Sequence, residues 1–348
     1  MNINTLARPN IKILTPYSSA RDEFSGQAEV YIDANENPFD KSGLNRYPDP
    51  LAKKVKEKLS LIKHVPPEQI FLGNGSDEAI DVLVRIFCEP AKDNIIILPP
   101  TYGMYQISAD INNVAVKKVN LDYHFQPKVD EILAAADAHS KILFICTPNN
   151  PTGNDIKPER IKALLDHFKG IVAIDEAYID FSLSKSWTTL LKEYPRLVVL
   201  QTFSKAWGLA GIRLGMAFAN NEIITLMNKV KAPYNVNQLT QNAALAALDK
   251  EDLMQEQKKT ILKQRAILEK GLSEWPAVYN IYPSDTNFLL VKVSDAYSIY
   301  NFLLSRGIVV RNRTNITLCE GCLRITVGTP KENEFLLQTI KEYPLSIF

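Results

Sequence analysis

The sequence predicts an α/β fold in which helices cover a mostly parallel central sheet, with a smaller α+β domain beside it. Two observations predict the sheet: short, uninterrupted apolar runs recur along the middle of the chain, and amphipathic helical patterns lie between several of them. Strands that are apolar at every position are buried on both faces, which is typical of a parallel sheet between helices. The runs that we interpret as strands are 95–98, 142–146, 171–174, 197–200 and 214–219.

The amphipathic patterns predict three helices in this region. The first opens near Asp77, and its apolar residues recur at the spacing i, i+3, i+4 and i+7 between residues 80 and 87. We predict Ser76 as its N-cap, because a serine hydroxyl accepts a hydrogen bond from the free N–H groups of a first turn. The other two helices span 127–136 and 158–168, and each opens with a proline.

The pattern changes beyond about residue 232. A long helical stretch covers 251–272, and shorter alternating strands follow at 287–293, 308–311 and 323–327. We therefore expect two domains. The large α/β domain would comprise residues 40–231, and the small α+β domain would combine residues 1–39 with residues 232–348.

Composition and charge exclude several classes of protein. Hydrophobic residues make up 46% of the 348 residues, which argues against a disordered chain. Lys and Arg number 40 and Asp and Glu 39, so we expect neither a nucleic-acid partner nor a membrane surface. No stretch approaches the roughly 20 apolar residues of a membrane span, and the N-terminus lacks the apolar segment of an export signal. Because four cysteines are too few for a disulfide scaffold, we expect a cytoplasmic protein.

Polar and aromatic groups follow four of the predicted strands. Ligands of parallel sheets bind outside the carboxyl ends of the strands, so we expect these groups to lie near one another. The segments are Pro99–Gly103, Thr147–Gly153, Asp175–Tyr178 and Gln201–Lys205. Together they supply an aromatic ring, an amide, a carboxylate and an amine.

Each of these groups has an ordinary and a functional interpretation. Lys205 is either a surface lysine or, in a partly desolvated cleft, an amine with a lowered pKa that forms a Schiff base with a carbonyl. Asp175 is either a helix cap or half of an ion pair, or it keeps the pyridine nitrogen of pyridoxal phosphate protonated. Tyr178 and Asn150 could then donate to the phenolic oxygen of that cofactor, and Tyr102 could stack on its ring. Otherwise they are buried tyrosines and an Asn-Pro turn.

A phosphate on the cofactor would need an anion site. The turn Gly73-Asn-Gly75 opens a helix, and a helix N-terminus presents free backbone N–H groups to anions. Ser76 and Asp77 would offer those amides, while Ser204 and Arg213 would supply a hydroxyl and a positive charge. Many helices begin in this way, so the turn carries little weight by itself.

The segments resemble the fold-type I, pyridoxal-phosphate-dependent aminotransferases, and among them the histidinol-phosphate aminotransferase family. The resemblance runs from Leu14 to Gly328. One departure is Trp207, where phenylalanine is more usual in the family. The motifs that carry the resemblance are residues 73–78, 99–105, 147–153, 175–178 and 204–215.

The resemblance implies a role for each group around the cofactor ring. Lys205 carries the cofactor as a Schiff base and then acts as general base, and Asp175 pairs with the pyridine nitrogen. Asn150 and Tyr178 hold the phenolic oxygen, and Tyr102 stacks on the ring.

At the cofactor's phosphate, the resemblance implies binding by Ser76, Asp77, Ser204 and Arg213. Tyr47 matches the tyrosine that the family lends to the phosphate of the neighbouring subunit. A homodimer with shared active sites is therefore implied.

The resemblance also implies that two substrates share one pocket. Histidinol phosphate bears a phosphate, 2-oxoglutarate or glutamate bears two carboxylates, and the planar guanidinium of arginine pairs with either anion. Arg311 and Arg324 match the arginines that the family uses for this purpose, Tyr17 matches their tyrosine partner, and Asn150 lies beside them. Without the resemblance, we would interpret the two arginines as surface residues on edge strands.

Other functions stay open from the residues alone. The same scaffold could serve an aromatic aminotransferase or a decarboxylase similar to threonine-phosphate decarboxylase. A non-catalytic regulator would need a DNA-binding helix-turn-helix, for which we find no room before Tyr17. Cys319-Glu-Gly-Cys322 has no second cysteine pair and no nearby histidine, so we predict no metal site there.

Overall fold

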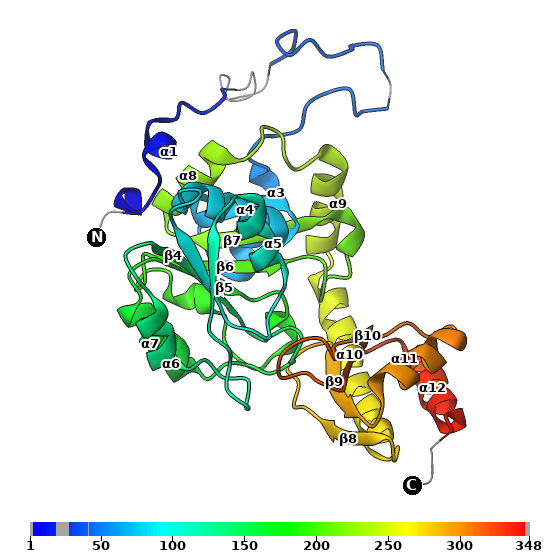
Figure 1. The fold of residues 1–348 in the computed structure, drawn as a ribbon. Coiled ribbons are helices and arrows are strands. Elements are labelled where there is room, and N and C mark those ends of the chain that lie inside the picture. The colour runs from blue at the N-terminus through cyan, green and yellow to red at the C-terminus, as the bar shows by residue number, and fades with distance from the viewer. Residues whose placement is uncertain (1–2, 19–27, 41, 345–348) are drawn as a thin grey trace.

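The computed structural model describes residues 3–18, 28–40 and 42–344 of the chain. Within these ranges, the largest feature is a seven-stranded sheet with helices on both faces (Figure 1). β7 pairs antiparallel with both of its neighbours, and the other strands run parallel to one another. The predicted class, a mostly parallel sheet between helices, is therefore confirmed. In spatial order the strands are β1 (Ile70–Asn74), β7 (Leu214–Ala219), β6 (Leu197–Thr202), β5 (Ile171–Asp175), β4 (Ser140–Cys146), β2 (Asn94–Ile97) and β3 (Ala115–Lys118).

The direction of β7 follows from its connection to β6. Residues 203–213 join the two strands and contain only a short 3-10 helix, Ala210–Ile212. Parallel neighbours need a long crossover, whereas a short connection returns the chain antiparallel. The apolar run 214–219 predicted this strand, but its composition did not reveal its direction.

Two helical layers cover the sheet. One face carries α4 (Gly75–Phe87), α5 (Met104–Ile111) and α8 (Asn221–Val230). The other carries α3 (Lys53–Lys63), α6 (Val129–Ala135) and α7 (Pro158–His167). β4 shows why its run is apolar throughout: Ile142 and Phe144 belong to the core under the first layer, and Leu143 and Ile145 to the core under the second.

The start of α4 differs from the prediction. The helix begins at Gly75, with Asn74 in the N-cap position, so Ser76 lies within the first turn. The Asn74 side chain makes no capping hydrogen bond to the first turn, and the Glu78 carboxylate accepts the backbone N–H of Asn74 itself. Of the two predicted opening prolines, Pro158 is the first residue of α7, whereas Pro127 precedes the start of α6.

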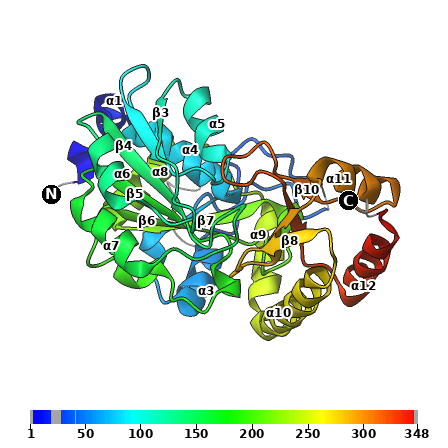
Figure 2. The same ribbon diagram turned by 60° about the horizontal axis from the view of Figure 1, so that its bottom comes forward.

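A second, antiparallel sheet forms a smaller body beside the first (Figure 2). Its strands are, in order, β10 (Arg311–Asn312), β11 (Cys322–Thr326), β9 (Phe288–Val293) and β8 (Val278–Ile281). It packs against the helices α10 (Glu251–Ser273), α11 (Ala296–Ser305) and α12 (Pro330–Thr339).

The predicted strand 308–311 is wrong in its bounds. The backbone amide of Ile308 donates to Leu303 at the end of α11, so the chain is still leaving the helix there. Pairing starts at Arg311, which lies opposite Arg324 on β11. Arg311 therefore begins the strand instead of ending it.

The N-terminal segment lies against the helices of the large sheet. Ile3, Ala7 and Ile11, the last within α1 (Pro9–Ile13), belong to the same buried cluster as α4 and α8. α9 (Gln238–Leu248) packs against α3. The division of the chain at residues 40 and 232 remains a prediction.

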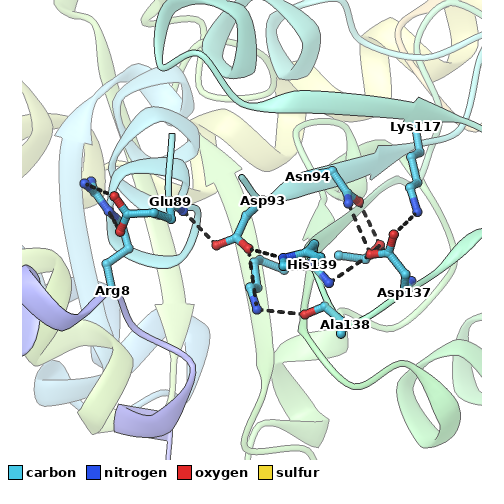
Figure 3. A network of polar contacts seen from close by, with 10 residues as sticks. Arg8, Glu89, Asp93, Asn94, Lys117, Asp137, Ala138 and His139 are labelled. Atoms are coloured by element: carbon cyan, nitrogen blue, oxygen red, sulfur yellow. Dashed lines mark hydrogen bonds and ion pairs between the residues drawn. The ribbon is translucent and has the colours of Figure 1, made fainter. Parts of the chain in front are cut away.

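A polar network ties together the edge opposite the carboxyl ends of the parallel strands (Figure 3). Arg8 contacts Glu89 through Nε and Nη2, at 3.1 and 3.3 Å. Asp93 accepts the backbone N–H of Glu89 and lies 3.2 Å from Nδ1 of His139. This network is structural, because it lies away from the cleft described below. Of the helices within the described ranges, none combines the length and the apolar character that crossing a bilayer requires.

Candidate active site

A cleft of about 540 Å³ lies where the carboxyl ends of the parallel strands face the second sheet. Tyr102 follows β2, Asn150 follows β4, Asp175 is the last residue of β5, and Lys205 follows β6. All four side chains line the cleft. The groups that we expected to meet at the carboxyl ends of the strands are therefore neighbours in the fold.

The cleft holds all but two of the remaining candidate residues. Tyr17 and Tyr47 do not line it and are 72% and 51% exposed. The ring of Tyr47 stacks on Tyr234, with centroids 4.5 Å apart, beside a separate pocket. The residues that do line the cleft are Ser76, Asp77, Tyr178, Ser204, Arg213, Arg311 and Arg324.

Asp175 is a buried carboxylate, only 2% exposed. Its burial raises its pKa to about 6. Two donors oppose this shift: the hydroxyl of Tyr105 donates to Oδ2 at 2.7 Å, and the backbone N–H of Ala177 donates to Oδ1 at 3.1 Å. The carboxylate is thus held in one orientation.

Tyr105 is a residue of the site that the sequence reasoning missed. It lies on α5, fully buried, and its ring stacks on Phe144 with centroids 4.7 Å apart. It also packs edge-on against Tyr102. The signal available was its place in the motif 99–105, because Tyr102 precedes the first residue of α5 and the two tyrosines share no helical periodicity.

The pKa of Lys205 is shifted in the opposite direction to that of Asp175. Burial lowers the pKa of its amine, the positive charge of Arg324 lowers it further, and Asp175 partly offsets both. Its Nζ lies 5.5 Å from the ring centroid of Tyr178. Burial also raises the pKa of the Tyr178 hydroxyl, so that hydroxyl stays protonated and can donate.

The start of α4 forms one end of the cleft. The first N–H groups of a helix have no partner within it and favour anions. The Asp77 carboxylate accepts from the hydroxyl of Tyr102 at 3.0 Å and from Nη2 of Arg213 at 3.2 Å. β7 passes close to the first turn of α4 at Gly215. Only glycine fits there, because a Cβ would lie 2.1 Å from the backbone nitrogen of Ser76.

Arginines line the opposite wall. Nη1 of Arg324 donates to Oδ1 of Asn150, so the amide Nδ2 of that side chain is the donor it can offer to a ligand. The Arg324 guanidinium also lies 5.2 Å from the ring centroid of Phe288. Arg311 and Arg313 line the same wall, and Arg313 was missed by the sequence reasoning.

The two cysteines of Cys319-Glu-Gly-Cys322 are buried and free. Burial raises the pKa of Cys319 to about 12 and that of Cys322 to about 11, so neither thiol is activated. Across the described ranges, no group of three or more His, Cys, Asp and Glu side chains is arranged to hold a metal ion.

Residues 20–340 match the family model described as aminotransferase class I and II. The chain belongs to this family. Curated relatives of this aminotransferase include the histidinol-phosphate aminotransferase of Parabacteroides distasonis, 54% identical over 344 residues and 99% of each chain. The histidinol-phosphate aminotransferase of Cytophaga hutchinsonii is 52% identical over 98% of this chain and 99% of that one.

Solved structures show the same fold. The histidinol-phosphate aminotransferase of Clostridium acetobutylicum superposes on this aminotransferase with a TM-score of 0.79 and 26% identity, covering 86% of this chain and 90% of that one. The Sinorhizobium meliloti enzyme of the same name, in complex with pyridoxal-5'-phosphate, gives a TM-score of 0.78 over 86% and 84% of the two chains. At 23% identity, this second likeness concerns the fold alone.

Proposed function

We propose that this aminotransferase converts histidinol phosphate and 2-oxoglutarate to 3-(imidazol-4-yl)-2-oxopropyl phosphate and glutamate, in histidine biosynthesis. The observation that carries the proposal is the cleft itself. It combines the buried carboxylate of Asp175, an amine of lowered pKa at Lys205 and a wall of arginines. Relatives with 52–54% identity over nearly the full chain, all named histidinol-phosphate aminotransferases, support the substrate assignment.

The chemical groups of the cleft fit pyridoxal phosphate. When bound, this cofactor supplies a protonated ring that takes up the electron pair released at the amine-bearing carbon of the substrate. Asp175 would hold the proton on the ring nitrogen, and Lys205 would be the point of covalent attachment. Asn150 through Nδ2 and Tyr178 through its hydroxyl would donate to the phenolic oxygen, with Tyr102 against the ring face.

The phosphate of the cofactor would lie at the start of α4. Ser76 and Asp77 would contribute backbone N–H groups there. Ser204 would contribute its hydroxyl, and Arg213 its positive charge.

Lys205 would also move the proton that transamination requires. Its Nζ would take the proton from the carbon that bears the substrate amine, and a lowered pKa suits an amine to act as a base near neutral pH. Arg311 and Arg324 would bind the phosphate of one substrate and the distal carboxylate of the other, with Asn150 beside Arg324.

We infer a homodimer as part of this proposal. Residues 28–40 extend away from the rest of the molecule at the top of Figure 1 and expose large apolar side chains, Ile32 at 91% and Phe39 at 86%. Tyr47 lies outside the cleft of its own chain and would complete the phosphate site of a second copy. Four free, buried cysteines suit a reducing compartment, so we assign the enzyme to the cytoplasm.

Half-reactions test the proposal. The cofactor-loaded protein, mixed with histidinol phosphate alone, should lose its yellow colour and release one equivalent of the ketone product per active site. Adding 2-oxoglutarate should restore the colour and release glutamate. Release of carbon dioxide from threonine phosphate, with no bleaching by histidinol phosphate, would favour the decarboxylase. Bleaching by aromatic amino acids but not by histidinol phosphate would favour an aromatic aminotransferase.

A further inference from the structure

Three guanidinium groups share the wall of the cleft that faces Lys205. Arg311 and Arg324 lie directly opposite each other on β10 and β11. Arg313 follows β10, and its backbone N–H donates to Cys322 at 2.8 Å, which fixes its position next to β11. All three side chains line the same cavity. Like charges opposite each other destabilise a sheet, so the arrangement lacks a structural rationale.

The chain supplies little to balance these charges. Elsewhere in the same domain, Arg306 pairs with Glu342 at 3.1 Å. Within the part of the chain that the structure describes, no such ion pair joins an acid to Arg311, Arg313 or Arg324. The Nε atoms of Arg313 and Arg324 are buried and have no hydrogen-bond acceptor there. Buried, unmet donors on charged groups are costly, and an anionic ligand would satisfy them.

The electrostatic setting of Arg313 agrees with this geometry. Burial lowers the pKa of its guanidinium, and the charges of Arg324 and Arg311 lower it further. A buried guanidinium beside two other positive charges is stabilised more by a doubly charged anionic ligand than by a singly charged one. A phosphate ester carries close to two negative charges and three terminal oxygens near neutral pH, whereas a carboxylate carries one charge and two oxygens.

We propose that Arg313 is a third anion-binding residue of the substrate pocket, and that it makes the pocket prefer a phosphate dianion to a carboxylate. The proposal deepens and rests on the proposed function, because both substrates must use this wall. Arg311 and Arg324 suffice for the carboxylate of 2-oxoglutarate. The third guanidinium adds binding for the phosphate of the amine donor.

Steady-state kinetics of Arg313→Gln test this preference on the cofactor-loaded enzyme. Loss of a charge-assisted contact should raise the KM for histidinol phosphate about 10- to 100-fold, with the KM for 2-oxoglutarate raised no more than about 3-fold. Arg313→Lys keeps the charge without the planar fork and should recover part of the loss. Arg306→Gln, in the same domain and outside the cleft, is the matched control and should change neither value.

Calorimetric titration with methyl phosphate gives a readout that does not depend on turnover. Arg313→Gln should weaken its binding to the loaded enzyme by the same 10- to 100-fold, and the difference should shrink below about pH 6, where the phosphate becomes a monoanion. Equal KM changes for both substrates, or unchanged methyl phosphate affinity, would overturn the role of Arg313. A wild-type enzyme that binds methyl phosphate but does not transaminate histidinol phosphate would instead refute the proposed function.

Discussion

Asp175, at the end of β5, combines burial with two hydrogen-bond donors that point at its two oxygens. Burial opposes its charge, whereas Tyr105 and the backbone N–H of Ala177 favour it. The pKa of about 6 is the balance of these effects. A cationic ring nitrogen next to this carboxylate would tip the balance towards the charged form.

The pH dependence of stability tests this balance in the cofactor-free protein. Folding raises the pKa of Asp175 from 3.8 to about 6, so the folded state holds this proton more tightly than the unfolded state does. The resulting contribution to the free energy of unfolding is complete below pH 3.8 and is lost as the pH rises through 6. That difference corresponds to about 3 kcal/mol. Between about pH 4.5 and pH 7.5, Asp175→Asn should therefore gain up to that amount in unfolding free energy relative to wild type, by denaturant titration. A pH-independent difference would contradict this assignment.

Removing the hydroxyl of Tyr105 should weaken cofactor binding without disturbing the core. In Tyr105→Phe the ring can still stack on Phe144, but Asp175 loses a donor and its pKa rises further. A hydrogen bond to a charged group is worth about 1.5–3 kcal/mol, so cofactor affinity should fall about 10-fold or more in a fluorescence titration. Tyr123→Phe, at an exposed tyrosine, is the control. Equal affinity in both variants would show that the contact is unimportant.

At the level of elements, apolar patterning predicted β2, β4, β5, β6 and β7 of the large sheet, but it missed β1, although four of its five residues are buried. The strand at 214–219 has the predicted bounds, and the predicted helix 251–272 differs from α10 by one residue at its end. The edge strand β3 was not predicted, because its polar, partly exposed residues do not form an apolar run. The direction of β7 and the bounds of β10 depend on connections and cross-strand pairing, which local patterns do not encode.

Residues 3–13 offer an element-scale test, because one side chain, that of Arg8, makes several of their polar contacts with the rest of the molecule. Arg8 holds this segment through both oxygens of Glu89 and through the carbonyl of Arg85. Arg8→Ala should therefore speed amide exchange in this segment, by a local loss of roughly 1 kcal/mol, and leave the exchange of β4 unchanged. Hydrogen-exchange mass spectrometry measures both. Lys128→Ala, which removes an ion pair with Glu131 on α6, should leave the segment unaffected.

At the scale of the whole molecule, the topology of the sheet explains how much of the cleft could be foreseen. Parallel strands bring their carboxyl ends to one edge, so Tyr102, Asn150, Asp175 and Lys205 meet without any knowledge of side-chain packing. Tyr105 and Arg313 were missed for another reason. Their roles depend on which way a buried helix faces and on how the second sheet meets the first.

The proposed homodimer can be tested by disrupting the exposed segment 28–40. Phe39→Asp places a charge in the exposed segment 28–40 and should shift the protein from twice 39.2 kDa towards that mass in analytical ultracentrifugation. Activity should fall with the dimer population, because Tyr47 would no longer reach a second active site. Tyr279→Asp, on β8 at the far end of the molecule in Figure 1, is the control. A monomeric wild type with full activity would refute shared sites.

Borohydride reduction of the cofactor-loaded protein, followed by peptide mass spectrometry, tests the central claim most directly. The account predicts one pyridoxyl adduct, on the peptide that carries Lys205, and none in Lys205→Ala. An adduct on a different lysine, with Lys205 unmodified in an active preparation, would contradict it.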